Sequence, residues 1–261
     1  MRGKMRRAAL LLAAAVFVTG SVLAIHQIMD YRAARMSYDE AQAAVGMPQE
    51  RVTELPDPEV PLEEVPQSEE DRLRALDLDP LWDANEDVLG WISVPGTSIS
   101  YPLLQGEDNN EYLRRSWDRS RNSAGRIFLE ERNSADLGDF NTIIYGHHMR
   151  NGTMFAPLVD YQRQSFYEEH SEIYMVDQSG IRKYKVFAAY EVSTTGDTYR
   201  VEFSEEGTKQ DFMEFCMGQS VFETGTIPTA EDQILTLSTC TGDGYDTRWV
   251  VQAVLTDVFT D

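Results

Sequence analysis

The chain has 261 residues, with 44 Asp and Glu against 23 Lys and Arg, which gives a formal net charge of −21. Charged residues at 26% and hydrophobic residues at 42% are ordinary for a globular domain, and so large an acidic excess excludes a nucleic-acid binder, which needs a basic surface. Two cysteines are too few for a disulfide framework, and no Cys/His pattern has the spacing of a zinc site, so we expect no metal and no cofactor.

The amino-terminal segment combines a basic start with an apolar run. Four of the first seven residues are basic, and residues 8–25, AALLLAAAVFVTGSVLAI, carry no charge. This run reaches the length that crosses a bilayer as a helix, and a basic flank stays in the cytoplasm. We predict a cytoplasmic tail over 1–7, a single-pass transmembrane anchor over 8–25, and an extracellular remainder. A cleaved secretory signal is the alternative, although its apolar core is usually shorter, about 7–15 residues.

Residues 26–66 are predicted to form an extracellular linker. Its first part, 28–44, has the Ala, Arg and Glu content of a helix that continues out of the membrane. Gly46 and Pro48 end that helix, and five of the ten prolines fall between Pro48 and Pro66 among acidic residues. Because proline fixes φ and like charges repel, we expect the second part to be an extended spacer that holds a domain off the membrane.

The remainder, residues 67–261, is predicted to form one β-rich domain. A helix is expected from Ser68 through Leu78, and further helical stretches over 154–170 and 204–220, the last capped by its first residue. Eight β-rich runs recur between turn residues: 90–94, 98–104, 125–130, 141–146, 172–177, 182–193, 233–240 and 248–259. Short strands at this spacing, many of them alternating apolar with polar residues, indicate an antiparallel β sandwich or barrel.

Two segments carry groups that suit nucleophilic catalysis. Residues 142–149, TIIYGHHM, place His147 and His148 directly after a β run, and Cys240 ends another run, ahead of Arg248. A cysteine nucleophile needs an imidazole to move protons and a donor for the developing oxyanion. Cys240, one of the two histidines and Arg248 supply these three kinds of group.

Two other interpretations stay open. A Cys216–Cys240 disulfide would fit an oxidising compartment and a non-catalytic, wall-associated domain. Alternatively, Cys216 shares a helix face with Phe212 and Phe215 and has the position of a small buried hydrophobe. A secreted cysteine endopeptidase that uses water as acceptor is the second possibility, although the cysteine motifs of papain-like enzymes and caspases are absent from the sequence.

The sequence resembles the sortases, membrane-anchored cysteine transpeptidases of Gram-positive bacteria, and specifically class B. TLSTC (236–240), with Arg248 eight residues later, is similar to the family's TLxTC…R signature, and IIYGHHMRNGTMF (143–155) to its histidine segment. Residues 85–113 are similar to the stretch with which class B members begin their barrel. The resemblance covers about residues 80–259 and implies an eight-stranded β-barrel, with an N-terminal helix and another helix between strands six and seven.

The resemblance also implies roles for particular residues. Cys240 is the expected nucleophile, His147 the general acid and base, and Arg248 the cation that binds the substrate carbonyl and the oxyanion. Consecutive residues at a strand edge point to opposite sides, so only one histidine can face the cysteine, and the family motif selects the first. The substrate-binding positions carried over from the family are Asn109, Leu113 and Ser238.

The implied reaction is transpeptidation. A secreted protein with a C-terminal sorting signal of the NPxTx or PxTG type enters the groove, the cysteine attacks the threonine carbonyl, and a thioester acyl-enzyme forms as the amine leaves. An amino group of a peptidoglycan precursor then resolves the thioester. The implied partners are sorting-signal proteins, the cell-wall precursor and, through the N-terminal helix, the membrane.

Overall fold

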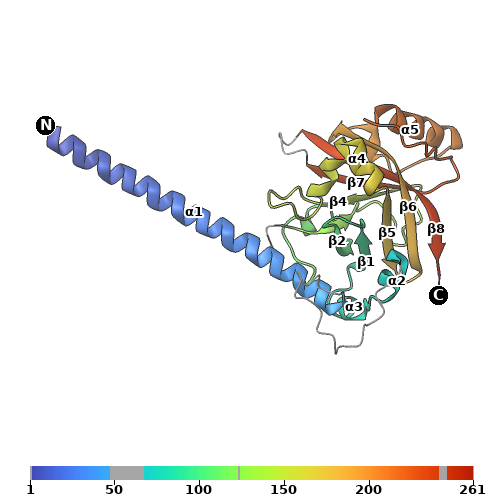
Figure 1. Ribbon diagram of the computed structural model, residues 1–261, viewed down its shortest axis with the longest axis horizontal. Helices are drawn as coiled ribbons and strands as arrows, with labels where there is room; N and C mark the ends of the chain where they lie inside the picture. Colours follow the sequence, from blue (N-terminus) through green and yellow to red (C-terminus); the bar gives the residue numbers. More distant parts are fainter. Residues whose placement is uncertain (1, 48–67, 123, 241–245, 261) are drawn as a thin grey trace, which may run out of the picture.

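The computed structural model describes residues 2–47, 68–122, 124–240 and 246–260, and eight strands in it form a closed barrel (Figure 1). The order around the barrel is β1-β2-β3-β4-β7-β8-β6-β5. The strands are β1 (Val88–Ser93), β2 (Ser100–Leu104), β3 (Ile127–Leu129), β4 (Asn141–Tyr145), β5 (Glu172–Asp177), β6 (Gly180–Ser193), β7 (Ile234–Cys240) and β8 (Thr247–Phe259). Each strand coincides with or overlaps a predicted run, so the predicted mainly-β, eight-stranded barrel is confirmed. The proline-rich spacer, 48–66, lies outside the described residues.

The helices lie before the barrel and in its connections. They are α1 (Arg2–Ala44), α2 (Glu69–Arg74), α3 (Asp79–Ala84), η1 (Glu111–Leu113), η2 (Ala156–Gln162), α4 (Gln164–Glu169), η3 (Asp197–Tyr199) and α5 (Glu206–Gln219). The helix between the sixth and seventh strands is α5, as expected from the resemblance. Its predicted cap is wrong, since the N-cap is Glu205 and no side chain makes a capping hydrogen bond.

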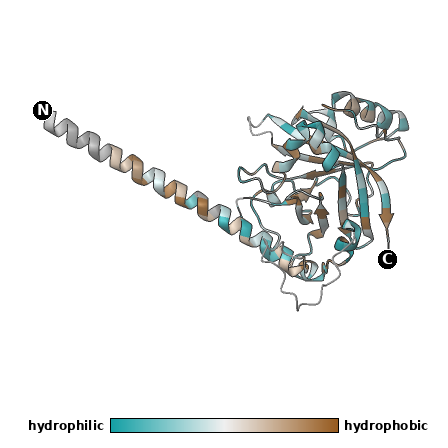
Figure 2. Cartoon of the chain, viewed as in Figure 1, coloured by the Kyte–Doolittle hydropathy of each residue, from teal (hydrophilic) through white to brown (hydrophobic). Residues whose placement is uncertain are grey.

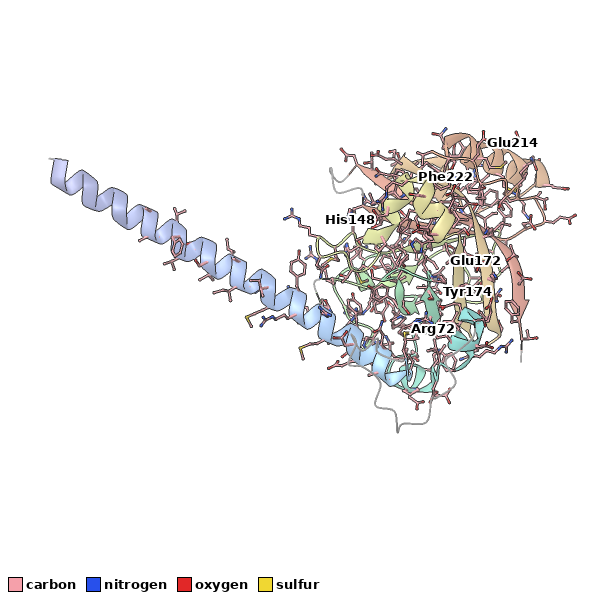
Figure 3. The ribbon with its side chains drawn as sticks, in the orientation of Figure 1. Arg72, His148, Glu172, Tyr174, Glu214 and Phe222 are labelled. Atoms are coloured by element: carbon pink, nitrogen blue, oxygen red, sulfur yellow. The ribbon has the colours of Figure 1, made fainter. Side chains whose placement is uncertain are left out.

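The helix predicted from Ser68 to Leu78 is shorter than expected, and a separate helix follows it. Ser68 caps α2, and its hydroxyl accepts a hydrogen bond from the Asp71 backbone N–H at 3.1 Å. The helix ends at Arg74, and α3 begins with Asp79 and Pro80 in its first turn, where proline is tolerated because no intrahelical N–H bond is required. Tyr174 of β5 donates to Glu70 at 2.9 Å and thereby ties α2 to the barrel; Figure 3 labels Tyr174 beside this helix.

Strand direction differs from the expectation of an antiparallel sheet. The pairs β2–β3 and β4–β7 are parallel, and the other six are antiparallel. Alternation of apolar and polar residues specifies which face a side chain takes, but it carries no information on the direction of the neighbouring strand. The parallel β4–β7 pair brings the carboxyl ends of these two strands, and the residues that follow them, to the same edge of the barrel.

The side chains of β7 alternate between the interior of the barrel and its outer face. Leu235 and Leu237 belong to the large interior cluster, together with Val251 and Ala253 of β8. Because successive side chains alternate, Ser238 and the terminal cysteine of β7 lie on the outer face. On that face α5 covers another part of the sheet, through a cluster that includes Phe212, Met213, Cys216, Ile234 and Val250.

The long helix α1 projects away from the barrel and docks on it only at its carboxyl end (Figure 1). Its middle part is predominantly apolar (brown in Figure 2), and it is the one helix of the described residues long and apolar enough to cross a membrane. Ala34, Tyr38, Ala41 and Val45 are buried against the body of the protein. Their spacing of four, three and four residues forms one helical stripe, so the end of this helix packs on the domain that we predicted to start at residue 67.

Candidate active site

A cavity of about 510 Å³ opens on the outer face of the barrel, where β4, β7 and β8 meet. It is lined by Asn109, Leu113, Phe128, Arg132, Tyr145, Gly146, His147, Thr194, Tyr199, Ser238, Thr239, Cys240 and Arg248. The structure thus brings all three expected catalytic residues and all three expected substrate-binding residues to one cavity. A concave site with an apolar wall and a few convergent polar groups is the usual form of a ligand-binding site.

Cys240 and Arg248 are direct neighbours across the β7–β8 pair. The two residues are register partners in this antiparallel ladder. Side chains of such partners leave the sheet on the same face, with Cβ atoms about 4.5–5.5 Å apart. Arg248 Nη1 donates to the Thr247 carbonyl at 3.0 Å, and both side chains are partly exposed at the cavity. The sheet therefore places a guanidinium beside the thiol.

The His147 ring is held by one of its nitrogens. His147 Nε2 lies 3.0 Å from the Leu113 carbonyl oxygen. Because a carbonyl can only accept, Nε2 carries the hydrogen of this bond, and Nδ1 is the nitrogen left for exchanging protons in the cavity. The ring also lies against Gly125, which has a φ of 58° and where a Cβ would be only 2.8 Å from His147 Cδ2.

His148 occupies a different position from its neighbour. It is not among the residues that line the cavity, but its Nδ1–H donates to the Cys240 backbone carbonyl at 2.9 Å (His148 is labelled in Figure 3). The prediction that only the first histidine enters the site agrees with this geometry. The sequence analysis did not predict this hydrogen bond to the end of β7, because the residues around His148 do not indicate which backbone carbonyl its ring reaches in the fold.

A buried carboxylate organises one wall of the cavity. Glu130 is 2% exposed, and it accepts hydrogen bonds from Arg132 Nε at 2.6 Å, from Asn109 Nδ2 at 2.8 Å and from the Tyr145 hydroxyl at 2.9 Å. Burial by itself would raise the pKa of Glu130, but these donors outweigh it and hold the pKa below its usual value. The Asn109 amide oxygen accepts from the Glu131 backbone N–H at 2.9 Å, so both ends of this amide are oriented by the protein.

Ser238 and Tyr199 line the cavity next to Tyr145. Their hydroxyl oxygens lie 2.9 Å apart, and Tyr199 stacks on Tyr145 with ring centroids 6.2 Å apart. Burial raises the pKa of Tyr199 to about 12, so its hydroxyl stays protonated at neutral pH. Ser238 is 1% exposed and lines the cavity together with this tyrosine pair. Neither tyrosine was among the residues predicted for the site.

The second cysteine is remote from this chemistry. Cys216 lies on the buried face of α5 and is fully buried, and burial raises the pKa of its thiol to about 11. Both Cys216 and Cys240 are free thiols, which contradicts the disulfide on which the non-catalytic alternative depends. Within the part of the chain that the structure describes, no three His, Cys, Asp or Glu side chains are grouped so that they could hold a metal ion.

A barrel that carries a thiol, an imidazole and a guanidinium at one cavity defines a class of cysteine-dependent acyl-transfer enzymes. Comparison with known proteins identifies the family, because the sortase domain model matches residues 92–256. The chain belongs to the sortase family of cysteine transpeptidases, and its relatives place it with the sortase B proteins.

Three relatives illustrate the match. Sortase B of Staphylococcus aureus is 40% identical over 156 residues, which are 60% of this chain and 64%, or less than two thirds, of that protein. Sortase B of Listeria monocytogenes is 38% identical over 175 residues, 66% of this chain and 70% of that protein. A structure of the S. aureus sortase B–substrate complex superposes with a TM-score of 0.72 at 32% identity, covering 88% of this chain and all of that one.

Proposed function

We propose that this protein cleaves a C-terminal sorting signal of the NPxTx or PxTG type after its threonine and transfers the secreted protein to an amino group of a cell-wall precursor. The observation that carries the proposal is the direct pairing of Cys240 with Arg248, with His147 lining the same cavity. That a related sortase B forms a complex with its substrate supports a peptide as the ligand.

The first half of the reaction forms a thioester. The Cys240 sulfur, as a thiolate, attacks the threonine carbonyl carbon, and the negative charge that develops on the carbonyl oxygen is stabilised by the Arg248 guanidinium. The carbon–nitrogen bond then breaks. The leaving amine takes a proton from His147 Nδ1, which holds the proton given up by the Cys240 thiol, while Nε2 keeps its own hydrogen in the bond to Leu113.

The second half reverses these roles. The acceptor amine attacks the thioester carbonyl and gives a proton to His147, and the carbon–sulfur bond breaks to release the Cys240 thiolate. One amide bond is broken and one is formed, so the reaction needs neither an oxidant nor a reductant. Arg248 again stabilises the negative oxygen of the tetrahedral intermediate.

The cavity walls suit an extended peptide. Leu113 and Phe128 supply apolar surface, while Asn109 and Ser238 supply polar groups that the protein already orients. We propose that these walls bind the residues that precede the scissile bond. A site of this kind obtains specificity from a few fixed polar groups, since any that the peptide leaves unpaired would be costly.

Product analysis tests the proposal against hydrolysis. The protein is incubated with sorting-signal peptides of both types, with and without a glycine-based amine acceptor, and products are identified by mass spectrometry. We expect a ligated product whose yield rises with acceptor concentration at the expense of the hydrolysed peptide. Hydrolysis alone at every acceptor concentration would favour the endopeptidase alternative. Absence of cleavage for both peptide types, with no acyl-enzyme detected, would contradict catalysis.

Membrane anchoring is the second part of the proposal. The apolar middle of α1, with no buried residue in its most hydrophobic window, supports an anchor over residues 8–25, and the basic residues before it support a cytoplasmic amino terminus. The barrel then lies outside the cell, where both sorting-signal proteins and wall precursors occur. A cleaved signal remains the alternative, and it would release the barrel from the membrane.

A further inference from the structure

The segment that runs from η1 to β3 carries both groups that hold the His147 ring. Residues 112–122 and 124–126 are here named the support loop. Near its start, the Leu113 carbonyl accepts the hydrogen bond from His147 Nε2 at 3.0 Å. Near its end, Gly125 lies at the same edge of the ring, because a Cβ added there would be only 2.8 Å from His147 Cδ2. The position of the support loop therefore sets the position of the imidazole.

The support loop depends on contacts from elsewhere. After η1, its described residues contain only one isolated bridge, between Arg115 and Arg121, and no strand or helix. A segment without a continuous hydrogen-bonded ladder opens at low free energy unless other elements hold it. Its own backbone hydrogen bonds, such as those from Asn122 N–H to the Arg114 carbonyl and from Arg126 N–H to the Tyr112 carbonyl, both 2.9 Å, are isolated turn contacts. Contacts from other elements therefore add to the placement of the imidazole.

Ser37, on the docked end of α1, provides three contacts to this loop. Its backbone carbonyl accepts a hydrogen bond from Trp117 Nε1 at 3.0 Å. Its hydroxyl lies 2.5 Å from the Ser116 hydroxyl and accepts from Arg126 Nη2 at 2.7 Å. Ser116 and Arg126 are buried, at 0% and 1% exposure, while Ser37 is half-buried, so these contacts lie at the edge of the interior.

Tyr38, the next residue of α1, contacts the end of the loop beside the histidine. Its hydroxyl lies 3.3 Å from the Gly125 carbonyl oxygen, and it also contacts the Met154 sulfur. The Arg126 guanidinium carbon lies 4.5 Å above the Tyr38 ring, and Tyr101 packs edge-on to that ring at 5.0 Å between centroids. Tyr38 therefore holds the backbone of the residue that lies against the imidazole.

We propose that Ser37 and Tyr38 are positioning residues, which hold His147 in its reactive orientation through the support loop. The helix that serves as the membrane anchor is then also part of the scaffold of the active site. The inference rests on the proposed function, because it takes His147 as the group that moves protons.

The test uses the full-length protein in detergent with the variants Ser37→Ala and Tyr38→Phe, alone and combined. The combined variant removes only two hydroxyl groups from α1. We expect it to lower kcat about 10-fold with KM changed less than about twofold, since a misplacement on the order of 1 Å at a reacting group costs up to about 100-fold. Ser37→Thr, which keeps the hydroxyl, should retain turnover near that of the wild type.

Val45→Ala is the matched control. Val45 directly follows the same docked helix and is also fully buried, but it belongs to a different cluster from Tyr38. It should lower the thermal midpoint at least as much as the combined variant while leaving kcat unchanged. If Val45→Ala lowers kcat as much as the combined variant does, loss of docking in general explains the effect and the inference is wrong.

The histidine itself gives a readout that does not depend on turnover. The chain has four histidines, so single substitutions assign the ring signals in an isotope-labelled sample. We expect the His147 ring shifts to change in the combined variant and to be unchanged in Val45→Ala. If His147→Ala is inactive but the combined variant keeps wild-type kcat and wild-type His147 signals, this inference is wrong and the proposed function still stands. An active His147→Ala variant would instead remove the assignment of the acid and base, and this inference with it.

Discussion

At the scale of single residues, the environment of each thiol distinguishes the two cysteines. Cys240 ends a strand at the cavity beside a guanidinium, whereas Cys216 is buried among the side chains of α5 with its pKa raised to about 11. A thiol must ionise to act as a nucleophile, and an apolar interior disfavours the thiolate. Only the first cysteine therefore combines access with a nearby cation.

Cys240→Ala is expected to abolish the acyl-enzyme, which intact-protein mass spectrometry detects after incubation with a sorting peptide. Cys216→Ala should keep turnover within a few-fold and lower the free energy of unfolding by about 1 kcal/mol, the scale of a small buried group removed from a core. Urea denaturation measures the second effect. Preferential alkylation of Cys216 over Cys240 in the folded protein would contradict the assignment.

Variants of Arg248 separate the effect of its positive charge from the effect of its guanidinium geometry. A guanidinium offers several donors in a rigid fork, and an ammonium offers a flexible point charge. Arg248→Ala should lower kcat/KM by about 10²–10³-fold or more, the usual cost of one oxyanion donor, and Arg248→Lys should fall between alanine and the wild type. Steady-state cleavage of a sorting peptide by the three forms checks this. A lysine variant with wild-type turnover would reduce the residue to a source of positive charge.

At the scale of secondary-structure elements, Glu130 connects three segments that form the cavity wall. Glu130 directly follows β3. Its carboxylate accepts hydrogen bonds from Tyr145 at the end of β4, from Asn109 before η1 and from Arg132 after β3. All three of its partners line the cavity. The Glu130 carboxylate thus orients residues of the cavity wall without lining the cavity itself.

Glu130→Gln is expected to raise KM about 10-fold with a smaller change in kcat. It should also cost about 1–3 kcal/mol of stability at pH 7, because it removes the buried charge and one of the two oxygens that accept from Asn109, Tyr145 and Arg132. Since its folded-state pKa is lowered, the wild-type carboxylate stabilises the fold above its unfolded pKa of about 4.3 and loses this contribution as the pH falls through the folded value. The stability difference between wild type and variant should shrink below about pH 4 in urea titrations.

The exposed Glu202 provides a control for this experiment. Glu202→Gln removes the same charge from the surface, and it should leave both KM and the pH dependence of stability unchanged. If Glu130→Gln behaves like this control, the wall does not depend on the buried carboxylate.

At the scale of the whole molecule, the distribution of charge and apolar surface predicts the topology. The basic residues precede the apolar part of α1, and the acidic barrel follows it. Protease added to intact, wall-stripped cells should remove the barrel, whereas a cytoplasmic marker protein should survive. Replacing the four basic residues of the amino-terminal tail with serine should reduce the fraction of correctly oriented chains. A barrel that is protected until the cells are lysed would contradict the orientation.

The elements that could be predicted from the sequence are those with local causes. The eight strands are β-rich runs between turn residues, many of them with a period-two pattern, and α1 contains an uninterrupted apolar run. Cys240, His147 and Arg248 stand in short motifs at strand ends, so a resemblance over three segments was enough to single them out. These features depend on neighbours in the chain, which the sequence displays directly.

The features that only the tertiary structure decided all join residues far apart in the chain. The parallel pairing of β4 with β7, the bond from His147 to the Leu113 carbonyl, the Glu130 network and the docking of Ser37 and Tyr38 on the support loop are of this kind. The sequence by itself identified the groups that we propose to carry the chemistry and the strands that present them. The packing decided how the imidazole is held, because that depends on a backbone carbonyl and a helix whose positions no local pattern encodes.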